Sequence, residues 1–200
     1  MADSLTAPLT RRRLFLAGAL GLAAATSVAT IAPASAAEEE WTEGFMTRPE
    51  TREGFVVDAM DDWQIENTRF IIAVCKGHGL GESATVITLI TAIVESWLYN
   101  YDPAVDADSG GLFQQRPSMG WGTAVEVRHK KKAIDAFLGL SEHSQNAGLA
   151  QLVADPESWD PGAAAQAVQG SAFPDRYAEQ VATARLLWQR HAADVDAFTG

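Results

Sequence analysis

The most apolar segment of the chain runs from Ser83 to Leu98, and its only charged residue is Glu95. Apolar residues recur near helical spacing at Val86, Ile87, Ile90, Ile93, Val94 and Leu98, and Leu89 and Ala92 fill much of the rest. A helix that is apolar around its whole circumference is usually a buried one. The pattern therefore predicts a buried helix that ends close to Glu95, with Ser83 as its N-cap.

The rest of the chain also shows helical patterns, with turn residues between them. Further helices are predicted from Asp62 to about Lys76, from Thr123 to about Leu138, over 147–153, from Asp160 onwards, and from Pro174 or Asp175 onwards. Gly77 and Gly79 close the first of them, a capping box from Thr123 to Glu126 opens the second, and Asp160-Pro161 is a cap followed by a first turn. No alternating strand of useful length and no repeat is found, so an all-α fold is expected.

The N-terminus has the features of an export signal. Arg12-Arg13-Leu14-Phe15-Leu16 contains the twin-arginine pattern Arg-Arg-x-Phe-Leu, an Ala/Gly-rich apolar stretch runs on to Ile31, and Ala34-Ser35-Ala36 is a small-residue cleavage site. An uncleaved membrane anchor is the alternative. The expected organisation is a twin-arginine-type signal peptide over 1–36, an acidic lead-in over 37–60 and a helical domain over 61–200. The mature protein is expected to be secreted, extracellular or in the cell wall.

Composition and charge exclude several kinds of partner and architecture. The chain is 47% hydrophobic, enough for one ordinary domain, and no later stretch is long and apolar enough to span a membrane. Its 15 basic and 26 acidic residues give a net charge of −11. Without residues 1–36, which hold three arginines and one aspartate, 12 basic and 25 acidic residues remain, a charge of −13. Nucleic acid is therefore not an expected partner, and the basic run 128–132 is predicted to be a solvated helix face.

Glu95 is the strongest candidate for chemistry. Burial disfavours an ionised carboxylate, and so does the negative end of a helix dipole. Both effects predict a raised pKa for Glu95, which suits a general acid that works near neutral pH. The alternative is a structural glutamate paired with an arginine. Cys75, the only cysteine, excludes an intramolecular disulfide and is predicted to fill the core rather than to act as a nucleophile.

A glycine-rich, polar and aromatic loop follows Glu95. Gly110 and Gly111 allow backbone to approach a ligand closely, and Gln114 and Gln115 supply hydrogen-bond donors. Trp97, with Trp121 further along, offers flat apolar faces of the kind that sugar rings pack on. We expect at least one of the two glutamines to bind substrate, unless one of them ties the loop to the helix.

Four ordered motifs carry a resemblance to a known group of enzymes. These motifs are Glu95-Ser96, Ser109 to Gln115 with its continuation to Thr123, Ala165 to Gln169, and Ser171 to Tyr177. They resemble motifs of goose-type lysozymes and soluble lytic transglycosylases, and most of all a lysozyme-like family of secreted actinobacterial proteins. The resemblance covers roughly residues 60 to 190. It implies a lysozyme-like helical domain that cleaves the β-1,4 bond between amino sugars in peptidoglycan.

The resemblance also implies roles for individual residues. Glu95 is the expected catalytic acid, and the residues expected to bind substrate are Ser96, Gln114, Gln115, Trp121, Gln169 and Tyr177. Because no histidine or second base lies close in sequence, Ser96 is expected to orient Glu95 or cap backbone rather than to act as a nucleophile. Tyr177 matches a tyrosine that points at the catalytic glutamate in those relatives, although a place at the edge of the core is equally compatible with the sequence. Val168 departs from the relatives, which have an aromatic residue there.

The second catalytic group stays open. Asp102, Asp106 and Asp108 are candidates for a second carboxylate, Asp108 being the preferred one. The resemblance implies a third route, in which the acetamido group of the substrate attacks the anomeric carbon and Glu95 acts first as acid and then as base.

No metal or cofactor is expected. The acidic run from Asp106 to Gly110 has Pro117 where a calcium loop needs its glutamate. The favoured hypothesis is a monomer that acts on the glycan strands of peptidoglycan. A cell-wall glycan-binding protein without turnover is the alternative, suggested by Val168 and the acidic surface, and a partner-binding scaffold is a third.

Overall fold

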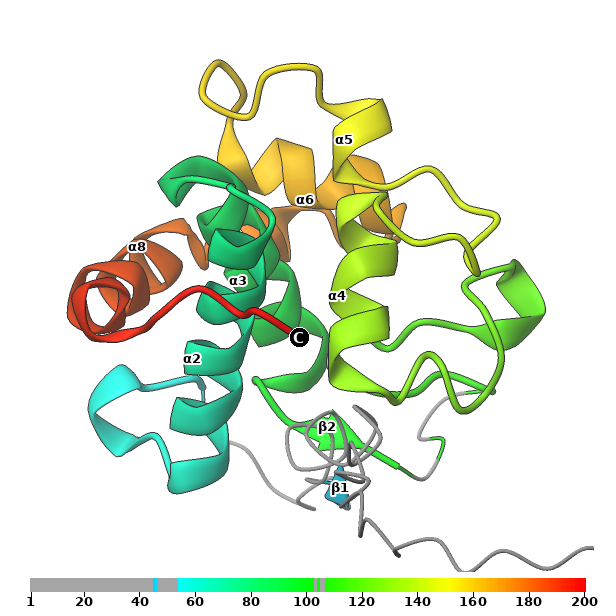
Figure 1. The fold of residues 1–200 in the computed structure, drawn as a ribbon, viewed down its shortest axis with the longest axis horizontal. Helices are drawn as coiled ribbons and strands as arrows, with labels where there is room; N and C mark the ends of the chain where they lie inside the picture. Colours follow the sequence, from blue (N-terminus) through cyan, green and yellow to red (C-terminus); the bar gives the residue numbers. More distant parts are fainter. Residues whose placement is uncertain (1–44, 47–53, 103, 105–106) are drawn as a thin grey trace, which may run out of the picture. The chain divides into compact units, whose positions relative to one another are not determined.

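The computed structural model describes residues 45–46, 54–102, 104 and 107–200, and over these ranges the chain is mostly helical (Figure 1). The α-helices are α2 (Asp62–Gly77), α3 (Glu82–Ser96), α4 (Lys130–Leu138), α5 (Leu149–Leu152), α6 (Pro161–Gln169), α7 (Asp175–Ala178) and α8 (Val181–His191). Short 3₁₀ turns are η1 (Val57–Ala59), η2 (Pro117–Met119) and η3 (Ala192–Asp194), and two-residue strands are β1 (Phe45–Met46) and β2 (Asn100–Tyr101). The all-α class is confirmed. The predicted segment 1–36 lies outside the described residues.

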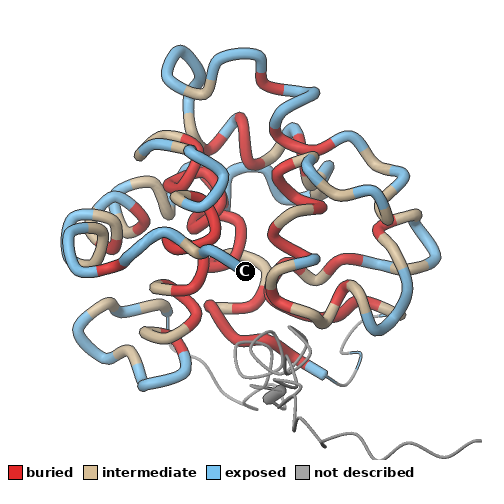
Figure 2. The backbone as a smooth tube through the Cα atoms, in the orientation of Figure 1, coloured by how far each residue is buried: buried red, intermediate tan, exposed pale blue. Residues whose placement is uncertain are grey.

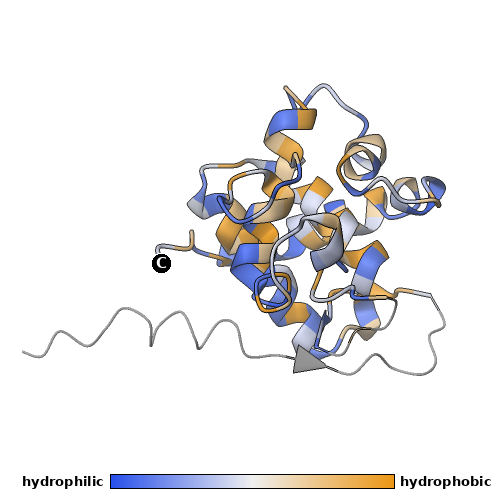
Figure 3. Cartoon of the chain, turned by 90° about the vertical axis from the view of Figure 1, so that its right-hand side faces the viewer, coloured by the Kyte–Doolittle hydropathy of each residue, from blue (hydrophilic) through white to orange (hydrophobic). Residues whose placement is uncertain are grey.

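Helix α3 is the element that the other helices pack around. It contacts α2, α4, α6, α7 and α8, and its backbone is buried along most of its length (Figure 2). Every residue from Ala84 to Ile93 is buried, which confirms the prediction from the apolar pattern. The surrounding helices carry hydrophobic and hydrophilic positions side by side (Figure 3), as elements that bury one face do.

Three threonines lie within this buried helix without leaving polar groups unpaired. The hydroxyls of Thr85, Thr88 and Thr91 each donate a hydrogen bond to the carbonyl four residues earlier, at 2.8, 2.8 and 3.0 Å. A hydroxyl that bonds its own helix costs little in the core. The threonines therefore allow α3 to be buried on all sides although it is not purely aliphatic.

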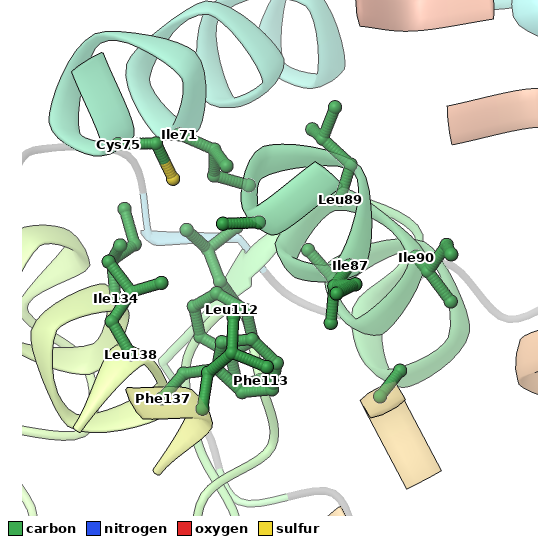
Figure 4. Close-up of a cluster of buried hydrophobic side chains, with 14 of the residues drawn as sticks. Ile71, Cys75, Ile87, Leu89, Ile90, Leu112, Phe113, Ile134, Phe137 and Leu138 are labelled. Carbon is green, nitrogen blue, oxygen red and sulfur yellow. The ribbon is translucent and has the colours of Figure 1, made fainter. Parts of the chain in front are cut away.

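The core joins α2, α3 and α4 to the loop that follows β2 (Figure 4). Phe113 from the loop stacks on Phe137 from α4, with ring centroids 5.1 Å apart and planes 5° from parallel. Cys75 from α2 is fully buried in the same core, and burial raises the pKa of its thiol to about 11. This confirms Cys75 as a core residue, because a thiol that stays protonated is a poor nucleophile.

Several predicted helix boundaries are confirmed. Helix α2 covers the predicted range and begins with a capping box between Asp61 and Gln64. Asp160 caps α6, its carboxylate accepting a hydrogen bond from the Ala163 amide at 2.8 Å. The short helix predicted over 147–153 is present as α5.

Two predicted starts are wrong. Helix α3 begins at Glu82 with Gly81 as its N-cap, so Ser83 lies inside the helix and does not cap it. Thr123 and Glu126 do exchange the capping-box hydrogen bonds, at 2.9 and 3.3 Å. The chain after them forms only turns, and α4 starts at Lys130. A capping box satisfies the first amides of a helical turn but does not decide how far the helix continues.

The predicted last helix is divided into α7 and α8 by Glu179 and Gln180. The lead-in over 37–60 is also more structured than expected in the part that the structure describes. Strand β1 pairs in parallel with β2, and Phe55 packs edge-on against Trp97, with ring centroids 6.0 Å apart.

The basic run 128–132 is not a solvated face, and this prediction was wrong. Lys130 is fully buried, with Nζ 2.7 Å from the carboxylate of Glu66 on α2 and 5.7 Å from the Phe70 ring. Lys131 pairs with Asp135 at 2.7 Å, and only Lys132 has a largely exposed side chain. The run joins α4 to its neighbours because a long lysine stem packs on apolar surface while its charge meets a carboxylate.

None of the described helices is both long enough and apolar enough to cross a membrane. The C-terminal segment packs along α2 and is hydrogen-bonded to it. Lys76 Nζ donates to the carbonyls of Ala192 and Val195 at 2.5 and 2.7 Å, and the Phe198 amide donates to Ala73 at 2.9 Å.

The pair between Lys130 and Glu66 yields a stability prediction. Glu66→Ala should lower the free energy of unfolding by on the order of 3 kcal/mol, because it leaves a buried ammonium without its partner. Lys130→Met keeps most of the volume and removes the charge, so it should cost less. In urea titrations the double variant should be more stable than Glu66→Ala alone. A double variant that is less stable than Glu66→Ala would show that the charge on Lys130 is solvated.

Candidate active site

Glu95 is the second-last residue of α3 and is half-buried. Burial raises its pKa above that of an ordinary glutamate, as the sequence predicted, while a hydrogen bond from Tyr177 and the charge of Arg176 act in the opposite direction. The site therefore holds a carboxyl group whose neutral form is favoured and which is still in contact with donors that stabilise its charged form.

The backbone turns sharply directly after Glu95. Trp97 and Leu98 both have left-handed backbone conformations, with φ of +57° and +63°, which cost free energy in residues other than glycine. Two side chains of α2 stabilise this turn: Gln64 donates to the Trp97 carbonyl at 2.9 Å and Asn67 to the Leu98 carbonyl at 2.7 Å. The amides of α2 thus determine where the chain leaves the Glu95 helix.

Tyr177 comes from α7 and donates a hydrogen bond from its hydroxyl to Glu95 Oε1. Its side chain is fully buried, so the two interpretations left open by the sequence, contact with Glu95 and a place in the core, both hold. Burial, and then the neighbouring Glu95, raise the pKa of Tyr177. The phenol therefore remains a hydrogen-bond donor over the whole range in which Glu95 titrates.

Ser96 ties the loop to the helix. Its hydroxyl lies 2.6 Å from the carbonyl of Leu112 and 3.0 Å from that of Ala92, and the residue is 1% exposed. A buried hydroxyl with two protein carbonyls beside it is not placed to contact a substrate. This geometry agrees with the predicted role of Ser96 in capping backbone and disagrees with a contact to substrate.

Gly110 and Gly111 are required by the protein itself rather than by a ligand. The Gly111 amide donates to the Tyr101 carbonyl at 2.9 Å, its φ is +72°, and a Cβ at this position would collide with the carbonyl oxygen of Val127. A Cβ on Gly110 would lie 2.6 Å from the guanidinium carbon of Arg128. The close approach expected from these glycines is real, but the partners are protein groups.

The predicted glutamines bind backbone carbonyls. Gln115 is 1% exposed and donates to the Ala133 carbonyl of α4 at 3.1 Å, so it is the glutamine that ties loop to helix. Gln114 is half-buried, with φ +47°, and donates to the Gly111 carbonyl at 3.0 Å. Gln169 of α6 is half-buried and donates to the Phe113 carbonyl at 3.3 Å. Gln114 and Gln169 keep partly exposed surface that a ligand can reach.

The two tryptophans predicted to offer flat faces to a sugar are less exposed than expected. Trp121 is 9% exposed and packs into the hydrophobic core, so it does not offer a flat face to a sugar. Trp97 is half-buried and packs against Phe55. Val168, where the motif resemblance implies an aromatic residue, is also a core residue.

Asp108, the preferred second carboxylate, is engaged within its own loop. Its oxygens accept hydrogen bonds from Arg116 Nε at 2.9 Å, from the Ser118 amide at 2.7 Å and from the Ser118 hydroxyl at 3.0 Å. These donors, Arg116 first, hold the pKa of Asp108 well below its usual range. Asp102 lies beside Arg128, and Asp106 falls outside the described residues.

Sequence reasoning missed two groups of residues. Gln64 and Asn67 stabilise the turn after Glu95 and were read only as part of a helix. Arg176 acts electrostatically on Glu95 and was noted only as part of a motif. The signal available for Arg176 was its place directly before Tyr177, whereas nothing local in the sequence marks the two amides of α2.

Within the described ranges, no group of three or more His, Cys, Asp or Glu side chains is arranged to hold a metal ion. Comparison of the chain with models of known protein families and with characterised proteins gives no match. The support for a function therefore comes from the geometry around Glu95 and from the motif resemblance.

The glycine at position 111 can be tested against a matched control. Gly111→Ala should destabilise the protein by about 3 kcal/mol or more, because it adds a collision with the Val127 carbonyl to an unfavourable φ. Gly79→Ala, at φ +71° with no atom within 4 Å of the new Cβ, should cost only about 1 kcal/mol. Urea titration of both variants gives the comparison. Equal losses would mean that the Val127 contact is not what requires glycine.

Proposed function

We propose that this protein is an exported glycosidase, a lysozyme or a lytic transglycosylase, that cleaves the β-1,4 bond between amino sugars in peptidoglycan. The observation that carries the proposal is the contact between Glu95 and Tyr177 at the end of a buried helix. It combines a carboxyl group of raised pKa with a permanent hydrogen-bond donor. The four-motif resemblance supports the same activity.

The arrangement supports general acid catalysis by Glu95. A phenol that donates to Oε1 leaves the carboxyl proton on Oε2, from which it can pass to the glycosidic oxygen as that bond breaks. The Tyr177 hydroxyl then stabilises the carboxylate that forms. Tyr177 is thus a positioning residue that favours proton transfer without exchanging a proton itself.

The nucleophile is best supplied by the substrate. The carboxylate of Asp108 is held by Arg116 and Ser118, an arrangement that fixes the loop rather than directing an oxygen at a sugar. In the proposed course the acetamido oxygen attacks the anomeric carbon as the leaving oxygen takes the proton of Glu95. The Glu95 carboxylate then acts as base, towards water or towards a hydroxyl of the same sugar, in which case an anhydro-sugar forms.

Export and substrate rest on the sequence. The twin-arginine pattern over 1–36 supports delivery to the outside of the cell, where the wall is found. Glycan strands of peptidoglycan are the proposed partner.

Replacement of the acid is the first test. Glu95→Gln should lower the rate of glycan release from cell-wall sacculi by about 10²–10⁴, because the amide has no acidic proton to give. Glu82→Gln is the control: Glu82 lies on the same helix, has a side chain 43% exposed and pairs with Arg185. The control should cleave like the parent.

The same assay separates the enzyme from a glycan-binding protein without turnover. Soluble fragments released by the parent and not by Glu95→Gln support the enzyme. A parent that binds sacculi and releases nothing would establish the binding protein instead. Unchanged release by a folded Glu95→Gln would remove Glu95 from the mechanism.

The pH profile tests the contact with Tyr177. Since burial raises the pKa of Glu95, the acid keeps its proton above the range of an ordinary glutamate, and kcat/KM should fall only as pH rises through that raised pKa. Tyr177→Phe removes a bond that favours the carboxylate. The pKa of Glu95 should then rise further, so the alkaline limb should move to higher pH while kcat falls. A limb that moves to lower pH would contradict the assigned role of the hydroxyl.

A further inference from the structure

An exposed aromatic ring and an exposed guanidinium form a stacked pair beside the proposed active site. The Arg176 guanidinium lies 4.3 Å from the centroid of the Phe173 ring, and Phe173 is 57% exposed. A ring with a guanidinium on its face presents an apolar surface and hydrogen-bond donors at one place. The pair is therefore a candidate recognition surface rather than part of the core.

The backbone that carries the pair is held firmly. The Ser171 hydroxyl accepts a hydrogen bond from the Phe173 amide at 3.2 Å, and the Arg176 amide donates to the Phe173 carbonyl at 3.3 Å. Gln166 of α6 donates to the Ser171 carbonyl at 2.7 Å. The backbone that carries the stacked pair is thus tied to α6, directly before Tyr177.

The position of Arg176 relates it to Glu95. It precedes Tyr177, which bonds to Glu95, and its charge is close enough to favour the Glu95 carboxylate. Among the described residues Arg176 forms no ion pair with an acidic side chain, whereas Arg116, Arg128, Arg185 and Arg190 each do. Its donors are therefore available to a ligand at the site, although the neighbouring Asp175 and Glu179 reduce the local positive potential.

We infer that Arg176, stacked on Phe173, binds a carboxylate of the substrate and selects glycan strands that carry one. A guanidinium offers paired donors that match the two oxygens of a carboxylate, and the ring beneath it limits its orientations. The inference rests on the proposed function and specifies its substrate class: an amino-sugar polymer with acidic substituents rather than a neutral one. It also gives a chain whose charge is −13 without residues 1–36 a local positive charge at the point where an anionic polymer would bind.

The carboxylate has two sources in peptidoglycan: the attached peptide, and the lactyl group on the sugar where no peptide is attached to it through an amide bond. Three soluble substrates distinguish them: glycan chains with peptides, the same chains after the peptides are removed, and chitin oligosaccharides, which have no carboxylate. KM and kcat are measured for the parent, Arg176→Gln, Arg176→Lys and Phe173→Leu, below the alkaline limb so that the pKa of Glu95 does not interfere. Arg185→Gln, which removes an exposed arginine from α8, is the control.

Arg176→Gln should raise KM roughly three- to tenfold for a carboxylate-bearing substrate, with little change in kcat and none in KM for chitin oligosaccharides. Arg176→Lys should raise KM less than Arg176→Gln does. The KM of Phe173→Leu should lie between those of the parent and Arg176→Gln. A selective effect on peptide-bearing chains assigns the carboxylate to the peptide. A selective effect on the peptide-free chains assigns it to the lactyl group, whose carboxylate is free only after the peptide is removed. Equal changes on charged and neutral substrates would overturn the inference.

Binding separates this inference from the proposed function. Calorimetric titration of the same three glycans into Glu95→Gln, with and without Arg176→Gln, measures recognition without turnover. A parent that cleaves none of the substrates would refute the glycosidase. Loss of affinity for the acidic glycans alone would still establish the carboxylate site, and no change in affinity for any glycan would overturn it.

Discussion

The burial of α3 on all sides is the constraint on which the rest of the structure depends. A helix without a solvent face needs neighbours around its whole circumference, and α2, α4, α6, α7 and α8 provide them. The same burial makes a charge acceptable only at the helix end. Glu95 is located there, half-buried, where its pKa is raised and a donor from α7 can reach it. One requirement of packing thus produces both the fold and a carboxyl group of raised pKa.

The motifs around Glu95 serve mainly to build the site. Ser96 and Gln169 bind the carbonyls of Leu112 and Phe113, Gln115 binds that of Ala133, and Gly111 fits beneath Val127. The three side chains tie the loop to α3, α6 and α4, and Gly111 allows it to pack against the turn before α4, so the loop is held by contacts within the protein. A preorganised frame of this kind places few groups at the substrate and holds those few accurately.

Charge is distributed in a way that composition does not reveal. Although the chain is acidic overall, most of the described lysines and arginines near the site are used internally: Lys130 with Glu66, Arg128 with Asp102, and Arg116 with Asp108. Arg176, whose charge acts on Glu95, forms no such pair among the described residues. The net charge is therefore a poor guide to the electrostatics around Glu95.

The sequence by itself determined the all-α class, most helix positions, the buried helix with Glu95 at its end and the core position of Cys75, because these follow from periodicity, caps and the cost of burying charge. It could not determine the roles of Ser96, Gln115, Trp121 and Gly111, since a hydroxyl, an amide, an indole or a glycine suits a ligand and a protein partner equally well. Tertiary structure decided those roles, as it decided that Lys130 is buried and that Tyr177 meets Glu95. These pairings join residues 64 and 82 positions apart, and no local pattern encodes a contact over that separation.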